Sequence, residues 1–194
     1  MINNNKRYLD LQQYNTWFDY FKSLIDYKLR DQKKKNIVFI SDCDGTLTDG
    51  RSYFKDKKEM KSYCSYDKEA VKFIIDYMRD EIIFVSGDKE GFNITENRIK
   101  NFFDSCKFTG PSCLNINSQE RTELVLKLKK QGNIVVFIGD ALSDISAMSS
   151  ADYSLTVHNA PQEVWKYCDY ISSIEGGHGG FSDCIFNFYE KILP

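Results

Sequence analysis

Two aspartates separated by one residue directly follow a short apolar run. The run is Ile37-Val38-Phe39-Ile40, and Asp42 and Asp44 come after it. β-Branched and aromatic residues closed by polar residues and glycine predict a buried strand that ends in a loop. Two carboxylates at that position repel each other, which a fold tolerates when a cation or a reaction uses them. Taken alone, the pair is equally compatible with a surface turn.

Two later apolar runs also end in small or acidic residues. Ser86-Gly87 follows the run 82–85. Gly139-Asp140 follows the run 134–138, and Asp144 comes shortly after it. Ligands of open α/β sheets bind beyond the carboxyl ends of the strands, so these side chains are expected to converge there.

One cation is predicted close to these acids. Arg121 lies in the first turn of a helix that we expect Ser118 to cap and Gly132-Asn133 to end. The helix dipole disfavours a positive side chain in that turn. Arg121 therefore indicates an anion to bind, with a solvated surface arginine as the ordinary alternative.

The elements that must position these residues alternate between strand and helix. This rhythm predicts an α/β fold, a mostly parallel sheet covered on both faces by helices. Asp67 is expected to cap the second helix, whose Val71, Ile74, Ile75 and Met78 face inward. Strands are predicted at 37–40, 82–85, 107–109, 134–138, 153–157 and 170–171, and helices at 68–80, 94–103, 118–131, 143–149, 161–167 and 181–192.

Two further segments flank the first strand. Residues 7–30 carry apolar side chains at steps of three and four, which predicts an amphipathic helix packed on the main domain, with a partner-binding helix as the alternative. We therefore divide the chain into a helical extension, 1–33, and a main domain, 34–194. The short runs 51–54 and 60–63 around a charged tip predict a β-hairpin beside the Asp42 loop.

Composition limits the class of protein. The 194 residues suit one main domain, and a net charge of -2 offers no electrostatic case for nucleic acid. No apolar run follows Met1 or approaches the length that spans a bilayer. The six cysteines form no C-x-x-C pair, so free thiols in the cytoplasm are expected. Cys43 is expected to be a small core residue, and His158 and His178 are too far apart to suggest zinc.

Together these motifs resemble the haloacid dehalogenase superfamily of phosphatases. The family pattern D-x-D-x-[TV] matches residues 42–46, Ser86 matches its Ser or Thr, Arg121 its Lys or Arg, and residues 140–144 its D-x-x-x-D. The resemblance implies a Rossmann-like three-layer sandwich. The gaps 49–68 and 87–110 leave room for a hairpin flap and one helix, but not for a separate cap domain.

A narrower resemblance covers residues 37 to 190. D-G-T-L-T-D-G at 44–50, V-H-N-A-P-Q-E-V at 157–164 and G-G-H-G-G at 176–180 are similar to the capless branch typified by 3-deoxy-D-manno-octulosonate 8-phosphate phosphatase. That branch includes phosphatases of nine-carbon acylneuraminate 9-phosphates. The resemblance implies a homotetramer in which neighbouring subunits help close each active site.

The expected chemistry is phosphomonoester hydrolysis with Mg²⁺. Asp42 is the expected nucleophile and forms an aspartyl-phosphate, while Asp44 is the general acid and then base. Asp42, Asp140 and the backbone carbonyl of Asp44 are the expected Mg²⁺ ligands, and Asp144 binds the ion directly or through water. Ser86, Gly87, Thr46 and Arg121 are expected to hold the phosphoryl group.

The chain departs from the branch around the substrate. Asp88, Tyr66 and Ser182 stand where the branch has arginines, and Ala141 replaces an aspartate. Lys61, Lys68 and His178 are the candidates to take over anion contacts, with a surface role as the alternative for each. Three other functions stay open: a phosphotransferase with the same chemistry, a catalytically weak interaction module, and a metal-dependent glycosyltransferase.

Overall fold

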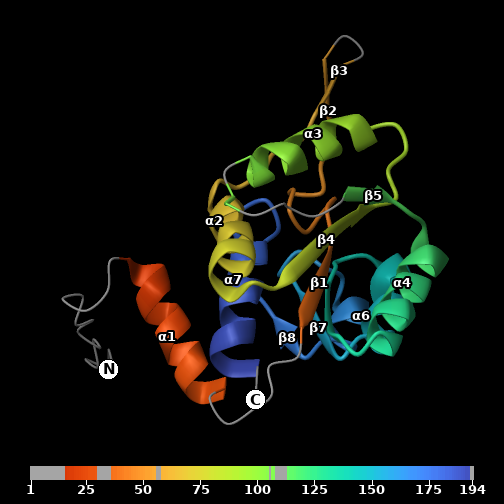
Figure 1. The fold of residues 1–194 in the computed structure, drawn as a ribbon. Coiled ribbons are helices and arrows are strands. Elements are labelled where there is room, and N and C mark those ends of the chain that lie inside the picture. The colour runs from red at the N-terminus through yellow and green to blue at the C-terminus, as the bar shows by residue number, and fades with distance from the viewer. Residues whose placement is uncertain (1–15, 30–35, 56–57, 105, 108–112, 193–194) are drawn as a thin grey trace, which may run out of the picture.

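The central layer is a parallel sheet, as predicted (Figure 1). The computed structural model describes residues 16–29, 36–55, 58–104, 106–107 and 113–192. The strand order is β5-β4-β1-β6-β7-β8, and every neighbouring pair is parallel. The strands are β1 (Ile37–Asp42), β4 (Glu81–Ser86), β5 (Cys113–Asn115), β6 (Ile134–Ile138), β7 (Tyr153–Thr156) and β8 (Tyr170–Ile171).

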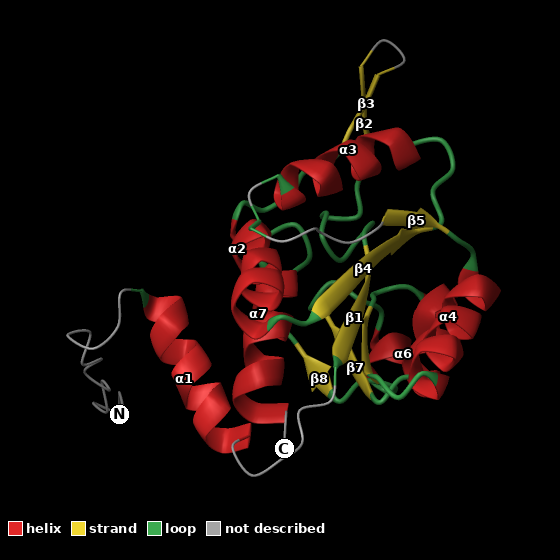
Figure 2. Ribbon diagram, viewed as in Figure 1, coloured by secondary structure: helices red, strands yellow, loops and turns green. Residues whose placement is uncertain are grey.

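Helices cover both faces of this sheet, which completes the expected three-layer α/β sandwich (Figure 2). Alternate residues of one strand enter opposite layers: Phe39 packs in the larger core cluster and Ile40 in the smaller. The helical elements are α1 (Trp17–Leu29), α2 (Tyr66–Lys72) continued by the π-helical η2 (Phe73–Met78), α3 (Phe92–Phe103), α4 (Ser118–Lys130), η3 (Leu142–Asp144), α5 (Ile145–Ser150), α6 (Gln162–Trp165) and α7 (Gly180–Asn187) continued by η4 (Phe188–Ile192).

The predicted hairpin is present and projects from the molecule (Figure 1). Strands β2 (Tyr53–Lys55) and β3 (Lys58–Met60) pair antiparallel, and a bridge between Thr48 and Tyr63 ties the base of the hairpin to the loop after β1. Residues that leave β3 therefore pass directly beside that loop.

The amphipathic stripe of the first helix packs on the main domain, as predicted. Phe21 and Ile25 of α1 are buried, and the Phe21 ring lies 5.4 Å from that of Phe73 in η2. Trp17 stacks on Phe21 and meets Phe186 of α7 edge to face. The part of the stripe before residue 16 lies outside the described residues.

Both predicted N-terminal helix caps are wrong. Helix α2 begins at Tyr66, and buried Asp67 turns inward, where its Oδ1 accepts hydrogen bonds from the Ser182 amide and hydroxyl of α7. Helix α4 is capped by Asn117, which exchanges hydrogen bonds with Glu120 in a capping box. Ser118 instead donates its hydroxyl proton to the carbonyl of Ser143.

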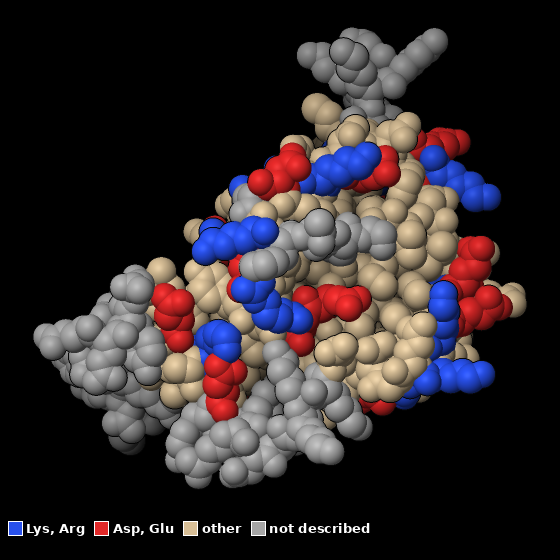
Figure 3. Space-filling model, in the orientation of Figure 1, with Lys and Arg blue, Asp and Glu red and all other residues tan. Residues whose placement is uncertain are grey.

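The predicted strand at 107–109 falls mostly on residues 108 and 109, which lie outside the described residues. The next described strand is β5, which begins at Cys113. Among the described helices, none is long and apolar enough to cross a bilayer. On the face drawn in Figure 3, basic and acidic side chains intermingle over α3 and α4.

Candidate active site

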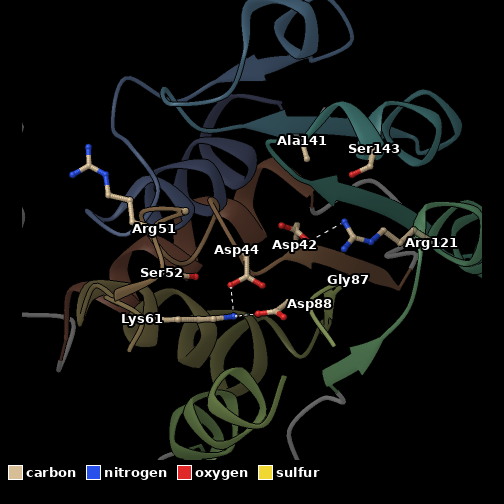
Figure 4. A pocket seen from close by; sticks show the side chains of 11 residues that line it. Asp42, Asp44, Arg51, Ser52, Lys61, Gly87, Asp88, Arg121, Ala141 and Ser143 are labelled. Atoms are coloured by element: carbon tan, nitrogen blue, oxygen red, sulfur yellow. Dashed lines mark hydrogen bonds and ion pairs between the residues drawn. The ribbon is translucent and has the colours of Figure 1, made fainter. Parts of the chain in front are cut away.

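Three strand ends meet at one point because β1 lies between β4 and β6. Asp42 is the last residue of β1 and Ser86 the last of β4, while Asp140 follows β6 by two residues. Asp42, Asp44, Gly87 and Arg121 line one pocket from separate segments of the chain (Figure 4), while Ser86 and Asp140 lie just behind its lining.

Three carboxylates form a candidate metal centre. One oxygen each from Asp42, Asp140 and Asp144 lies within 4.8 Å of the others. Mg²⁺ prefers hard oxygen ligands, and its bonds of about 2.1 Å place opposite ligands about 4 Å apart, so this cluster fits the ion. Thr46 donates a 2.9 Å hydrogen bond to Asp140 Oδ1 and orients that carboxylate.

The crowding of these acids affects their protonation. Burial, reinforced by the charge of Asp144, raises the pKa of Asp42 well above its usual range, although Arg121 opposes the shift. Burial also raises the pKa of Asp140 to about 7, against the hydrogen bond from Thr46 and with help from Asp144 and Asp44. Without a cation, the charged form of this cluster is therefore disfavoured.

Arg121 is buried against the same carboxylates rather than exposed to solvent. Its Nη1 lies 2.9 Å from Asp42 Oδ1 and also pairs with Asp144 Oδ1. Its Nε is buried and has no hydrogen-bond partner among the described residues. A guanidinium that lines the pocket fits an oxyanion such as phosphate.

Asp44 points to the opposite side of the pocket from Arg121 (Figure 4). Its Oδ2 accepts a 2.9 Å hydrogen bond from the Ser86 hydroxyl, and its Oδ1 lies 2.8 Å from Lys61 Nζ. Lys61 in turn lies 2.7 Å from Asp88 Oδ2. Ser86 was expected to hold phosphate, and its hydroxyl donates to Asp44 in this structure.

The pocket has a volume of about 190 Å³. Of the expected residues, Asp42, Asp44, Lys61, Gly87 and Arg121 line it. Thr46 is fully buried behind Asp140, and Lys68 does not appear among the described lining residues. Sequence reasoning did not place six others there, namely Gly50, Arg51, Ser52, Asp88, Ala141 and Ser143. Asp88 carried the clearest signal, because it follows a strand end.

Two later motifs support the loop after β1. The Asn159 side-chain amide donates a 2.9 Å hydrogen bond to the Gly45 carbonyl, and its Oδ1 accepts one from the Gly176 amide. A Cβ at Gly176 would lie 2.7 Å from the Gly45 carbonyl carbon. The glycine-rich segment thus packs directly on the backbone that follows Asp42.

Comparison with known proteins agrees with this geometry. A family model described as haloacid dehalogenase-like hydrolase matches residues 2–179. The 3-deoxy-D-manno-octulosonate 8-phosphate phosphatase of Yersinia pestis is 27% identical over 154 residues, which are 76% of this chain and 77% of that protein.

Solved structures show the same fold. The cobalt-bound deoxy-D-mannose-octulosonate 8-phosphate phosphatase of Haemophilus influenzae has a TM-score of 0.64 and 26% identity, and covers 80% of this chain and 87% of its own. The Moraxella catarrhalis 3-deoxy-D-manno-octulosonate 8-phosphate phosphatase, solved with magnesium, phosphate and its sugar acid, has a TM-score of 0.65 and 20% identity over 88% and 92% of the two chains.

These relatives support the prediction that the chain is a phosphatase. The family model spans most of the chain and includes each strand end that lines the pocket. The chain belongs to the haloacid dehalogenase-like hydrolase family.

Proposed function

We propose that this chain is a Mg²⁺-dependent phosphomonoesterase that acts on a small sugar-acid phosphate, of the 3-deoxy-octulosonate 8-phosphate or acylneuraminate 9-phosphate type. The observation that carries the proposal is the cluster of Asp42, Asp140 and Asp144 with Arg121, and with Asp44 across the pocket. The substrate class rests on the relatives from Yersinia and Haemophilus.

In the proposed first step, a carboxylate oxygen of Asp42 attacks phosphorus and the bond to the sugar oxygen breaks, which leaves an aspartyl-phosphate. The buried Arg121 orients Asp42, and its guanidinium, which lines the pocket, neutralises charge on the phosphoryl oxygens. Asp42, Asp140, Asp144 and the Asp44 carbonyl would hold Mg²⁺, which when bound offsets the repulsion between carboxylate and phosphate.

Asp44 is the proposed general acid and base. It gives a proton to the departing sugar oxygen and then takes one from the water that hydrolyses the aspartyl-phosphate. Ser86 and Lys61 bind its two oxygens and fix its orientation.

The pocket suits the reacting end of a substrate rather than a whole eight-carbon sugar. Ligand pockets usually exceed about 300 Å³, and this cavity holds about 190 Å³. The remainder of a sugar acid would extend past Gly50, Arg51 and Ser52. We propose that a neighbouring subunit of a homotetramer completes this part of the site.

The test is a screen of sugar phosphates with the wild-type protein in Mg²⁺, followed by the Asp42→Asn variant on each hydrolysed substrate. We expect stoichiometric release of inorganic phosphate by the wild type and a loss of at least about 10³-fold in the variant, because covalent catalysis is removed. Transfer of the phosphoryl group to another acceptor, or equal activity of the variant, would contradict the proposal.

A further inference from the structure

The ammonium group of Lys61 occupies an unusual position beside the active site. Its Nζ lies 2.8 Å from Asp44 Oδ1, 2.7 Å from Asp88 Oδ2 and 3.2 Å from Thr95 Oγ1. An ammonium has three donors, so each of them already has an acceptor. Its side chain is only 3% exposed. Lys61 therefore has no donor left for a substrate unless one of these contacts breaks.

The two groups behind Lys61 are themselves held in place. Asp88 Oδ1 accepts hydrogen bonds from the amides of Glu90 at 3.1 Å and Gly91 at 2.9 Å, at the start of α3. Its carbonyl accepts one from the Asn115 side chain at 2.8 Å. Thr95 is buried in α3. Asp88 and Thr95 thus form a fixed support on the side of Lys61 that faces away from Asp44.

The charges make this arrangement stable. Burial opposes the ammonium, but hydrogen bonds to Asp44 and Asp88 outweigh it and raise the pKa of Lys61 above its usual range. Lys61 stays cationic throughout the range in which a phosphatase works. It therefore acts as a permanent hydrogen-bond donor to Asp44.

Asp44 is consequently bound at both oxygens, by Lys61 from the segment after the hairpin and by Ser86 from β4. Two donors from separate elements restrict rotation of the carboxylate about its last torsion. We propose that Lys61, supported by Asp88 and Thr95, is a positioning residue that holds Asp44 Oδ1. Oδ2 then carries the proton to the leaving oxygen, and its hydrogen bond from Ser86 gives way when it is protonated. This inference rests on the proposed function, because it takes Asp44 as the general acid.

Two simpler roles of Lys61 predict different behaviour. If Lys61 only anchors the hairpin to the domain, its loss lowers stability and affects all substrates alike. If it contacts the sugar, its loss weakens binding of sugar phosphates and leaves aryl phosphates unchanged. If Lys61 orients the general acid, the rate loss on its removal should grow with the pKa of the leaving group, because poorer leaving groups depend more on protonation.

The test uses a series of para-substituted phenyl phosphates of nearly the same size and graded leaving-group pKa, with Mg²⁺ present. The slope of log kcat/KM against that pKa is compared among the wild type, Lys61→Met and Asp44→Asn. General acid catalysis contributes on the order of 10²- to 10⁴-fold, so we expect Lys61→Met to lose on the order of 10²-fold on the poorest leaving group and only a few-fold on p-nitrophenyl phosphate. Its slope should approach that of Asp44→Asn.

Lys100→Met is the matched control, because it removes an exposed lysine of α3 that does not line the pocket, and its slope should equal that of the wild type. Asp88→Asn is a second variant that tests the proposal if Lys61→Met fails to fold. It keeps an acceptor for Lys61 and removes one charge, so its slope should steepen less than that of Lys61→Met.

An unchanged slope in an active, folded Lys61→Met variant would overturn the inference and leave the proposed function intact. A rise in KM confined to sugar phosphates, with that same unchanged slope, would overturn it in favour of a substrate contact. A wild type that hydrolyses no phosphate ester would overturn the proposed function and this inference together.

Discussion

At the scale of single residues, the site depends on a glycine, Gly45, as well as on its acids. Gly45 has a φ of +99°, and a Cβ there would lie 2.6 Å from the Asp140 carboxylate carbon. The position thus requires glycine for two reasons: the backbone conformation favours glycine, and Asp140 occupies the space that a side chain would need.

Gly45→Ala should therefore displace Asp140 and weaken the metal centre. We expect a loss of phosphatase activity of at least about 10²-fold and weaker Mg²⁺ binding by calorimetry, beyond the roughly 1 kcal/mol that a strained backbone costs. Gly132→Ala is the control, since its φ is +90° but nothing lies within 4 Å of its added Cβ. That variant should lose some stability and keep its activity. Equal activity of the two variants would contradict the role assigned to Gly45.

At the scale of secondary-structure elements, a buried carboxyl joins α2 to α7. Asp67 Oδ1 accepts hydrogen bonds from the Ser182 amide at 3.1 Å and hydroxyl at 2.9 Å, while Oδ2 is buried without a partner among the described residues. Burial raises the pKa of Asp67 to about 6, although the Ser182 hydrogen bonds oppose the shift. The charged form is thus more costly in the folded protein than in the unfolded chain.

This contact predicts a pH dependence of stability. Because the folded pKa lies above the unfolded value, the contribution of Asp67 is fully present below about pH 4 and is lost as the pH rises through about 6. The loss should amount to roughly 2–3 kcal/mol. In urea unfolding at pH 4.5 and 7.5, the free energy of unfolding of Asp67→Asn should therefore increase relative to that of the wild type at the higher pH. Ser182→Ala keeps the titrating carboxyl, so its free energy of unfolding should fall with rising pH as in the wild type. An equal fall in Asp67→Asn would show that Asp67 is not the group responsible.

At the scale of the whole molecule, the pocket gathers more negative than positive charge. Asp42, Asp44 and Asp88 line the pocket with Arg51, Lys61 and Arg121, and Asp140 and Asp144 lie beside Asp42 in the metal cluster. Among the described residues, five acids therefore meet three basic residues, and a phosphate would add about two further negative charges. The fold brings these acids together from loops far apart in the chain. The metal-free protein should therefore bind phosphorylated sugars poorly and be inactive in excess chelator.

Mg²⁺ binding should also depend on pH. A carboxylate must lose its proton to bind a cation, and Asp140 in the metal-free protein has a pKa of about 7. Between pH 6 and pH 8 the Kd for Mg²⁺ should fall at least about tenfold, because Asp140 alone accounts for that change and the raised pKa of Asp42 adds to it. Calorimetric titration of the wild type at both values measures this change, and an unchanged Kd would contradict it. Asp140→Asn should bind Mg²⁺ weakly at both values.

The sequence by itself determined the kind of fold and predicted the loops that carry the acids. The apolar runs at 37–40, 82–85 and 134–138 predicted the strands that carry the site, because buried parallel strands have a local pattern. Asp42, Asp44 and Asp140 lie within four residues of the ends of the first and third runs, and Asp144 follows six residues after the third, so their placement needed only short-range information. Helix caps were less predictable, since Asp67 and Ser118 bond to distant elements instead of their own helices.

Tertiary structure alone decided which of these groups meet. The order β4-β1-β6 places Arg121 against Asp42 and Asp144. Lys61 and Asp88 are 27 residues apart, and Asp67 and Ser182 are 115 apart, with nothing in the spacing to pair them. Such contacts arise when strands and helices pack, because burial forces polar groups to find partners wherever the fold brings them within reach.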